Sequence, residues 1–234
     1  MPALAHNRVP ALRDGDRLTR DEFMLRWEAM PDLKFAELLD GVVHMPSPVG
    51  NSHNLLVPRI TWWLIQYADA TPGCEAGSDG TWLMSPDTAP QLDASLRIAA
   101  NGSSHLEKIY LAGAPELAVE VSYSSAARDL GIKSDLYRRH GVREYLVILA
   151  QENDVLWREV VKGRYRKLAP DPEGVIHSSV FPGLRLDTTA LWAKDWPKLR
   201  ATLVTAKSIS PSKSNNTMSR CVQSVLARAT GTKR

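Results

Sequence analysis

The sequence is poor in cysteine, with only Cys74 and Cys221 among its 234 residues. The two lie far apart, so they form neither a disulfide framework nor the closely spaced pair that holds a structural zinc ion. We therefore expect a reducing, cytoplasmic compartment. The amino terminus also lacks a positively charged leader followed by a continuous apolar stretch, so secretion is not expected.

Long apolar runs are missing as well. None approaches the ~18 residues that a membrane-spanning helix requires, so we expect no membrane association. Hydrophobic residues make up 44% of the chain and charged residues 24%, a balance typical of a globular protein with a packed core. The length suits one large domain or two small ones.

Acidic residues are absent from the carboxy-terminal segment. From Lys207 onward the chain has six basic residues and no acidic one, so this segment has a charge of +6. Because the whole chain has a net charge of +3, the residues before this segment have a net charge of −3. We predict a basic, disordered tail over residues 207–234, at most a salt-sensitive tether for nucleic acid. The body lacks the net charge of a nucleic-acid binder, although a local basic patch is compatible with this balance.

The hydrophobic pattern predicts an irregular lead-in over residues 1–17 and one domain over residues 18–206. Helical periodicity predicts helices over 20–30, 52–70, 125–140 and 189–204. Apolar stretches predict strands over 81–85, 91–98, 116–122 and 143–150, with a loop after the second strand and hairpins at Asp40-Gly41 and Lys162-Gly163. The strand–helix–strand order over residues 116–150 predicts a parallel crossover.

Three carboxylates interrupt the apolar strands: Glu37 in FAELLD, Asp93 in QLDASL and Glu120 in LAVEVS. A buried carboxylate requires a partner or a metal, because its isolated charge is costly to desolvate. Each of the three could form its own salt bridge with a lysine or arginine. If they converge instead, their oxygens form a site suited to Mg²⁺ or Mn²⁺.

Asp129, Lys133 and Tyr137 are spaced by four residues on the predicted helix and share a face. Asp129 and Lys133 could form a surface ion pair worth only ~0.3–0.5 kcal/mol. Alternatively, the ammonium group lies over the carboxylates, where it would offset the charge that develops on a phosphate under attack. The spacing alone does not distinguish these two arrangements.

Two further groups have less specific patterns. The basic residues Arg138, Arg139 and Arg143 flank the end of this helix, where cations favour the helix dipole. We interpret them as a solvated face, with phosphate contact as the alternative. We assign Trp62 and Trp63 to core and interface rather than to a platform for nucleobases.

The segment from Leu18 to about Leu191 resembles the Uma-two family of restriction-endonuclease-like proteins, within the PD-(D/E)XK nuclease superfamily. The matching stretches are LTRDEFMLRW, FAELLDGVVHMPSPVGNSHNLLVPRI, QLDASLRIA and GAPELAVEVSYSSAARDLGIKSDLYRRHGVREYLVI. The last stretch is the most specific. The resemblance implies an α/β, restriction-endonuclease-like core: a central mixed β-sheet flanked by helices, with additional β-hairpins.

The resemblance also implies a set of metal ligands. Asp93 and Glu120 match the two acidic ligands, and the backbone carbonyl of Val121 completes the usual trio. Glu37 matches an additional acid supplied by the first strand. Leu92 departs from the pattern, because it replaces the proline that usually precedes the aspartate, but no ligand is lost.

The catalytic lysine is displaced in this chain. The common superfamily pattern has lysine two residues after the glutamate, where this sequence has Ser122. Lys133 on the following helix matches the migrated lysine of the family. His53 matches a histidine of the second helix and, with Tyr137, is a candidate accessory residue, although a histidine at a helix start is more often a cap or packing residue.

Together these residues predict an enzyme, a Mg²⁺- or Mn²⁺-dependent endonuclease with Glu37, Asp93, Glu120 and Lys133 as its catalytic set. By resemblance the partner is a nucleic acid, DNA in the first instance, and a homodimer is an open alternative to a monomer. Two other functions remain open. One is a nuclease-fold binding or assembly module with little turnover, which the −3 body favours. The other is a phosphodiesterase that acts on RNA or a small phosphodiester.

Overall fold

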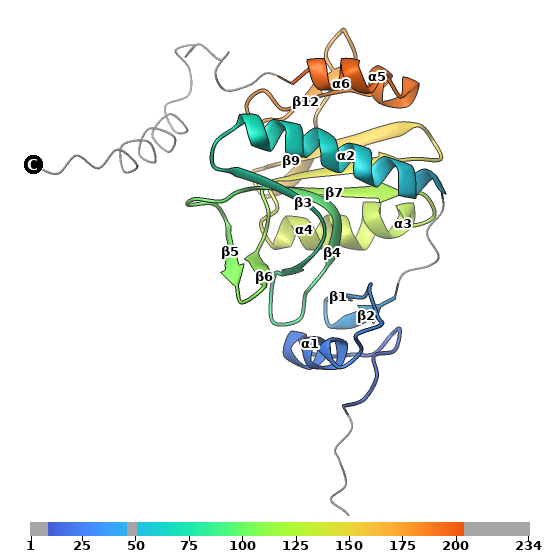
Figure 1. The fold of residues 1–234 in the computed structure, drawn as a ribbon, viewed down its shortest axis with the longest axis vertical. Coiled ribbons are helices and arrows are strands. Elements are labelled where there is room, and N and C mark those ends of the chain that lie inside the picture. The colour runs from blue at the N-terminus through green and yellow to red at the C-terminus, as the bar shows by residue number, and fades with distance from the viewer. Residues whose placement is uncertain (1–8, 46–50, 204–234) are drawn as a thin grey trace, which may run out of the picture.

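A computed structural model describes residues 9–45 and 51–203 of the chain. Its centre is an eight-stranded sheet with the order β10-β9-β8-β7-β4-β3-β6-β5 (Figure 1). The strands are β3 (Cys74–Leu83), β4 (Gln91–Ile98), β5 (Ser104–Glu107), β6 (Tyr110–Gly113), β7 (Leu117–Ser122), β8 (Glu144–Leu149), β9 (Asp154–Val161) and β10 (Arg164–Lys167). The pairs β7–β8 and β3–β6 are parallel and the others antiparallel, which confirms the predicted mixed sheet.

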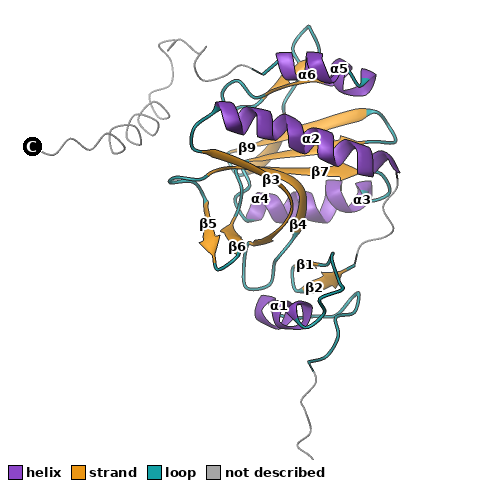
Figure 2. Ribbon diagram, viewed as in Figure 1, coloured by secondary structure: helices purple, strands orange, loops and turns teal. Residues whose placement is uncertain are grey.

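Helices cover both faces of this sheet (Figure 2). One face packs against α2 (Asn51–Ala70), α5 (Thr188–Ala193) and α6 (Trp196–Ala201). The other face packs against the crossover helix, which is divided into α3 (Ala126–Arg128), the π-helical turn η1 (Asp129–Lys133) and α4 (Ser134–Arg139). No helix within the described residues is both long and apolar enough to cross a membrane.

The central strands explain this layering. Every residue of β7 and of β8 is buried, as expected for parallel strands covered on both sides. Residues of β7 alternate between the two apolar layers, with Val119 and Val121 toward α2 and Ala118 toward α4. Trp63 of α2 is fully buried in the first layer, as the sequence indicated.

The amino-terminal part forms a third apolar cluster around α1 (Arg20–Glu28) and the hairpin of β1 (Glu37–Leu39) and β2 (Val42–His44). Asp40 and Gly41 both have positive φ, as a two-residue type I′ turn requires, and Lys162 and Gly163 repeat this between β9 and β10. Both predicted hairpins are therefore confirmed.

The packed region begins before the predicted domain boundary at Leu18. Leu12 is buried in the amino-terminal cluster, and the Gly15 N–H group donates to the Val43 carbonyl at 2.8 Å. Only part of the predicted lead-in can be compared, because residues 1–8 lie outside the described ranges. The predicted tail, residues 207–234, lies outside them entirely.

Two predictions of secondary structure were wrong. The single helix predicted over 189–204 is two helices, because Lys194 adopts a left-handed conformation and Asp195 caps a new helix by accepting the Lys198 N–H group. Pro197 starts this second helix, where a missing N–H group costs nothing. The predicted loop after β4 contains the β5–β6 hairpin, which alternation did not reveal because three of the four β5 residues are exposed.

Pro58 lies inside α2 rather than in its first turn, so the helix accommodates one missing backbone donor. A small hairpin of β11 (Val175–His177) and β12 (Arg185–Asp187), which the sequence did not indicate, adds Ile176 and Leu186 to the apolar cluster that α2, α5 and α6 form with the sheet.

The reactivity of the Cys74 thiol is a test of the packing between α2 and the sheet. Burial raises the pKa of its thiol to about 11, so the reactive thiolate is scarce at pH 8. With Cys221 replaced by serine, we expect iodoacetamide to alkylate folded Cys74 about 100-fold more slowly than the urea-unfolded chain. The rate should increase tenfold per pH unit up to about pH 11. Equal rates for the folded and unfolded chains at pH 8 would contradict the buried placement.

Candidate active site

Glu120 lies on β7, in the middle of the sheet, and its side chain is only 4% exposed. Its Oε1 accepts a hydrogen bond from the Tyr137 hydroxyl at 2.6 Å and lies 3.0 Å from Lys133 Nζ. The described residues make no hydrogen bond to its Oε2. One oxygen of this buried carboxylate is thus held in place, and the other is available to a ligand.

Lys133 joins two strands that are far apart in the sequence. Its Nζ lies 2.7 Å from Glu37 Oε1, as well as 3.0 Å from Glu120 Oε1. The Lys133 side chain is 5% exposed, so it does not form the surface ion pair with Asp129 that the spacing allowed. Desolvation by burial lowers the pKa of Lys133, but the Coulombic attraction of Glu120 and Glu37 outweighs it and raises the pKa, so the ammonium form persists.

Lys133 is the last residue of a π-helical turn. The predicted helix over 125–140 is helical from Ala126 to Arg139, but residues Asp129–Lys133 form the wider turn η1. Asp129, Lys133 and Tyr137 are all buried against the sheet, so they share one face as the four-residue spacing predicts. The Tyr145 hydroxyl donates to the Asp129 carbonyl at 3.0 Å and so stabilises this irregular turn.

Ser122 anchors the same turn to β7. Its hydroxyl donates to Asp129 Oδ2 at 2.5 Å, and the Ser125 hydroxyl donates to the same oxygen at 2.6 Å. Ser122, at the position where the superfamily pattern has lysine, thus hydrogen-bonds to the helix that carries Lys133. Sequence reasoning missed this role of Asp129, since neither serine carries a distinctive signal.

Asp93 lies where β4 and β7 separate. The ladder between them ends at the pair Ala94–Val119, and beyond it Asp93 Oδ2 accepts the Val121 N–H group at 2.7 Å. The N–H and C=O groups of one strand residue point toward the same neighbouring strand. The Val121 carbonyl therefore faces the same gap as the Asp93 carboxylate.

His53, near the start of α2, also meets Asp93. Its Nε2 lies 3.2 Å from Asp93 Oδ2, and this hydrogen bond raises the pKa of His53 against the opposing effect of burial. The two side chains are 24% and 19% exposed, more than Glu120 and Lys133. Access from solvent is thus on the Asp93 side of the site.

Glu37 ties the amino-terminal hairpin to the sheet. Besides contacting Lys133, its Oε1 accepts the Gln91 N–H group at 3.1 Å at the start of β4. The structure thus places Glu37, Glu120, Lys133 and Tyr137 in one contact network. Asp93 and His53 form a second pair, joined to the strand of Glu120 through Val121.

The site contains more negative than positive charge. Among the described residues, Lys133 is the one lysine that pairs with Glu37 and Glu120, and the carboxylates of Asp93 and Asp129 are nearby. Burial raises the pKa of Glu120 well above its usual value, with Lys133 opposing and Asp93 adding to the shift. An added cation would balance the excess negative charge.

The donor set fits a hard divalent cation. Asp93, Glu120 and the Val121 carbonyl offer only oxygen atoms, which Mg²⁺ and Mn²⁺ prefer. Across residues 9–45 and 51–203, no three His, Cys, Asp or Glu side chains are grouped to hold a metal ion by themselves.

Other buried carboxylates have structural roles. Glu116 accepts the Ile98 and Ser103 N–H groups, and Glu144 accepts the backbone N–H groups of Ser179 and Val180. Both stand at the amino-terminal ends of their strands, away from Glu120. These two carboxylates therefore hold backbone segments in place.

Glu144 provides a test of this structural role. Its carboxylate also accepts the hydroxyl groups of Ser178 and Ser179, so Glu144→Ala leaves several donors without an acceptor. We expect the free energy of unfolding, measured by urea denaturation, to fall by about 3 kcal/mol. Glu144→Gln, which keeps one acceptor oxygen, should lose less. A loss below ~0.5 kcal/mol for Glu144→Ala would show that the carboxylate does not hold this segment.

Comparison with known proteins places the chain within a family. The family model Uma2, described as putative restriction endonuclease, matches residues 20–189. A crystal structure of a putative nuclease belonging to DUF820, from Anabaena variabilis, superposes with a TM-score of 0.59 at 18% identity, and the match covers 76% of this chain and 98% of that one. This likeness shows a shared fold. No curated protein matches the sequence significantly.

Proposed function

The chain belongs to the Uma2 family, and from that membership and the carboxylate site we propose that it is a divalent-metal-dependent nuclease that hydrolyses phosphodiester bonds in DNA. One observation carries the proposal: a buried lysine lies within 3.0 Å of two carboxylates, beside a gap in the sheet that a third carboxylate enters. The family's description as restriction endonucleases favours DNA as the substrate.

We assign the metal to Asp93, Glu120 and the backbone carbonyl of Val121. When bound there, Mg²⁺ or Mn²⁺ would polarise a phosphate oxygen and lower the pKa of a bound water molecule. We assign Glu37 to positioning the lysine, because its Oε1 contacts Lys133 and Gln91. Its Oε2 makes no hydrogen bond to the described residues, so the role of further ligand that the family resemblance offered stays a prediction.

Three other side chains of the site have separate roles. The Lys133 ammonium group orients the attacking water and offsets negative charge that develops on the phosphate. Tyr137 holds one oxygen of Glu120 through its hydroxyl group, and burial raises the pKa of Tyr137, so it remains a donor. His53 orients Asp93 in the same way from α2.

A cleavage panel tests this function. The purified chain is incubated with duplex DNA, single-stranded DNA and RNA, each with Mg²⁺, with Mn²⁺ or with EDTA. We expect metal-dependent cleavage of DNA and none with EDTA. Metal-dependent cleavage of RNA alone would make it a ribonuclease. Metal binding without cleavage of any nucleic acid would indicate a binding or assembly module that keeps the nuclease fold.

A further inference from the structure

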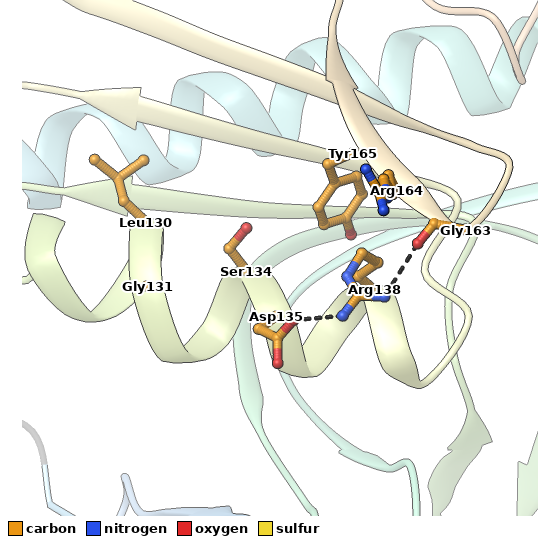
Figure 3. A pocket seen from close by; sticks show the side chains of 8 residues that line it. All are labelled: Leu130, Gly131, Ser134, Asp135, Arg138, Gly163, Arg164 and Tyr165. Atoms are coloured by element: carbon orange, nitrogen blue, oxygen red, sulfur yellow. Dashed lines mark hydrogen bonds and ion pairs between the residues drawn. The ribbon is translucent and has the colours of Figure 1, made fainter.

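A groove lies on the outer side of the crossover helix, between η1–α4 and the edge strand β10 (Figure 3). Its cavity measures about 450 Å³. It is lined by Leu130, Gly131, Ser134, Asp135, Arg138, Gly163, Arg164 and Tyr165. Neither the family match nor the proposed mechanism assigns it a role.

The lining of the groove has one positive charge in excess. Arg138 and Arg164 line it from the helix and from β10, and Asp135, the one carboxylate among the lining residues, pairs with Arg138 (Figure 3). Arg158 on β9 and Lys167 on β10 are directly paired across the two strands, so their side chains lie on the same face of the sheet. Lys167 shares this face with Tyr165, since strand residues two apart point the same way.

Arg158 is the most informative of these cations. It is only partly exposed, and its Nη1 donates to Ser134 Oγ at 2.7 Å. No carboxylate among the described residues pairs with it. Arg158 and Arg138 both lower the pKa of Tyr165, against the larger effect of burial that raises it, so both guanidinium groups lie close to this phenol. A shielded guanidinium without a counterion is an established recognition element for phosphate.

The groove begins beside the proposed catalytic site. Leu130 and Gly131 belong to η1, whose last residue Lys133 contacts Glu37 and Glu120 on the opposite side of the same helix. A side chain at Gly131 would meet nothing within 4 Å, so this end of the groove is open. The other end lies at the β9–β10 turn, where Arg138 donates to the Gly163 carbonyl at 3.1 Å (Figure 3).

We propose that this groove, with Arg138 and Arg164 in its lining and Arg158 and Lys167 beside it, binds the phosphodiester backbone of the nucleic acid that the enzyme cleaves. The inference rests on the proposed function, and it adds a substrate-binding surface outside the cleavage site. A local excess of positive charge around the groove is compatible with a body that carries −3. An edge strand leaves that surface open to a long ligand.

The test measures duplex binding without cleavage. The full-length chain in EDTA is titrated into a fluorescently labelled 20-base-pair duplex at several salt concentrations. Two double variants are compared: Arg158→Gln with Lys167→Gln, and Arg138→Gln with Arg164→Gln. Each double variant removes two phosphate contacts, so the slope of log affinity against log salt should fall by about 2, with at least a tenfold loss of affinity at low salt.

A control variant distinguishes loss of a cation at the groove from loss of a cation elsewhere on the surface. Arg200 is exposed on α6, on the opposite face of the sheet, and Arg200→Gln should leave affinity and slope unchanged. Every variant keeps the basic tail, so any binding by the tail is common to all. Folding of each double variant is checked by thermal unfolding, and the two variants are independent of each other.

Two outcomes would overturn the inference. Wild-type affinity and slope in a folded double variant would show that the groove does not bind the backbone. Binding of inorganic phosphate at the groove without any duplex binding would show an anion pocket only. If the wild type cleaves DNA while the variants bind duplex normally, the binding role of the groove is contradicted and the proposed nuclease activity is supported. If binding depends on the groove but no metal-dependent cleavage occurs, the binding role is supported and the proposed nuclease activity is contradicted.

Discussion

Replacing Lys133 with methionine should abolish metal-dependent cleavage. Methionine keeps most of the packing of the lysine stem but removes the ammonium group that lies between Glu37 and Glu120. Loss of one group that stabilises transition-state charge costs about 3–4 kcal/mol, so we expect a 10²- to 10³-fold lower kcat, measured with labelled duplex DNA and Mn²⁺.

The same substitution should weaken the fold. It leaves two buried carboxylates without their cation, and breaking a buried pair in this way costs about 3 kcal/mol. Circular dichroism and thermal unfolding are therefore measured on the same preparation. Lys198→Met is the matched control, because Lys198 also pairs with a carboxylate, that of Asp187, but on the α2 side of the sheet. Near-normal turnover in folded Lys133→Met would show that Lys133 is only an ion-pair partner.

Replacing Asp93 with asparagine should remove both metal binding and activity. The amide oxygen of asparagine can still accept the Val121 N–H group, so the gap between β4 and β7 should persist and the fold should be retained. The negative charge, however, is lost from one of two proposed carboxylate ligands. We expect Mn²⁺ affinity, measured by calorimetry, to fall at least 100-fold, and cleavage to fall with it.

Glu75→Gln is the control for loss of a strand-borne acid. Glu75 lies on β3 and pairs with Arg97 at the surface, so its replacement should leave Mn²⁺ affinity and cleavage unchanged. If Asp93→Asn binds Mn²⁺ as tightly as the wild type, Asp93 is not a ligand. The metal assignment would then have to move to another part of the chain.

Elements whose signals are local could be predicted from the sequence. The two type I′ hairpins follow from Asp40-Gly41 and Lys162-Gly163, and the continuous apolar runs of β7 and β8 identify the middle of the sheet. The break between α5 and α6 was missed, because it depends on a single left-handed residue, Lys194, that has no distinctive sequence signature.

The candidate site was only partly predictable. Asp93 and Glu120 stand out as charges inside apolar strands, but the same signal also applies to Glu144, which holds a loop. The inward placement of Lys133 depends on how the crossover helix packs on the sheet, where Ser122 holds Asp129 of the same helix. The four-residue spacing is the same in both arrangements, so it alone could not choose between a surface ion pair and a buried ammonium group.

The basic groove was hidden for a different reason. Arg138 was visible near the end of a helix and was interpreted as a solvated face. Its neighbours Arg158, Arg164 and Lys167 belong to the β9–β10 hairpin, and only the sheet topology brings hairpin and helix together. Net charge gave no indication, since the residues before the tail sum to −3.

The central claim is that Asp93 and Glu120 share one divalent cation. The most direct measurement is a crystal structure of the full chain grown with Mn²⁺, with the ion located by its anomalous scattering. We predict one peak about 2.0–2.6 Å from a carboxylate oxygen of Asp93, from Glu120 Oε2 and from the Val121 carbonyl oxygen. A peak elsewhere, or Asp93 and Glu120 carboxylates more than ~8 Å apart, would contradict the account, because one ion could not then reach both.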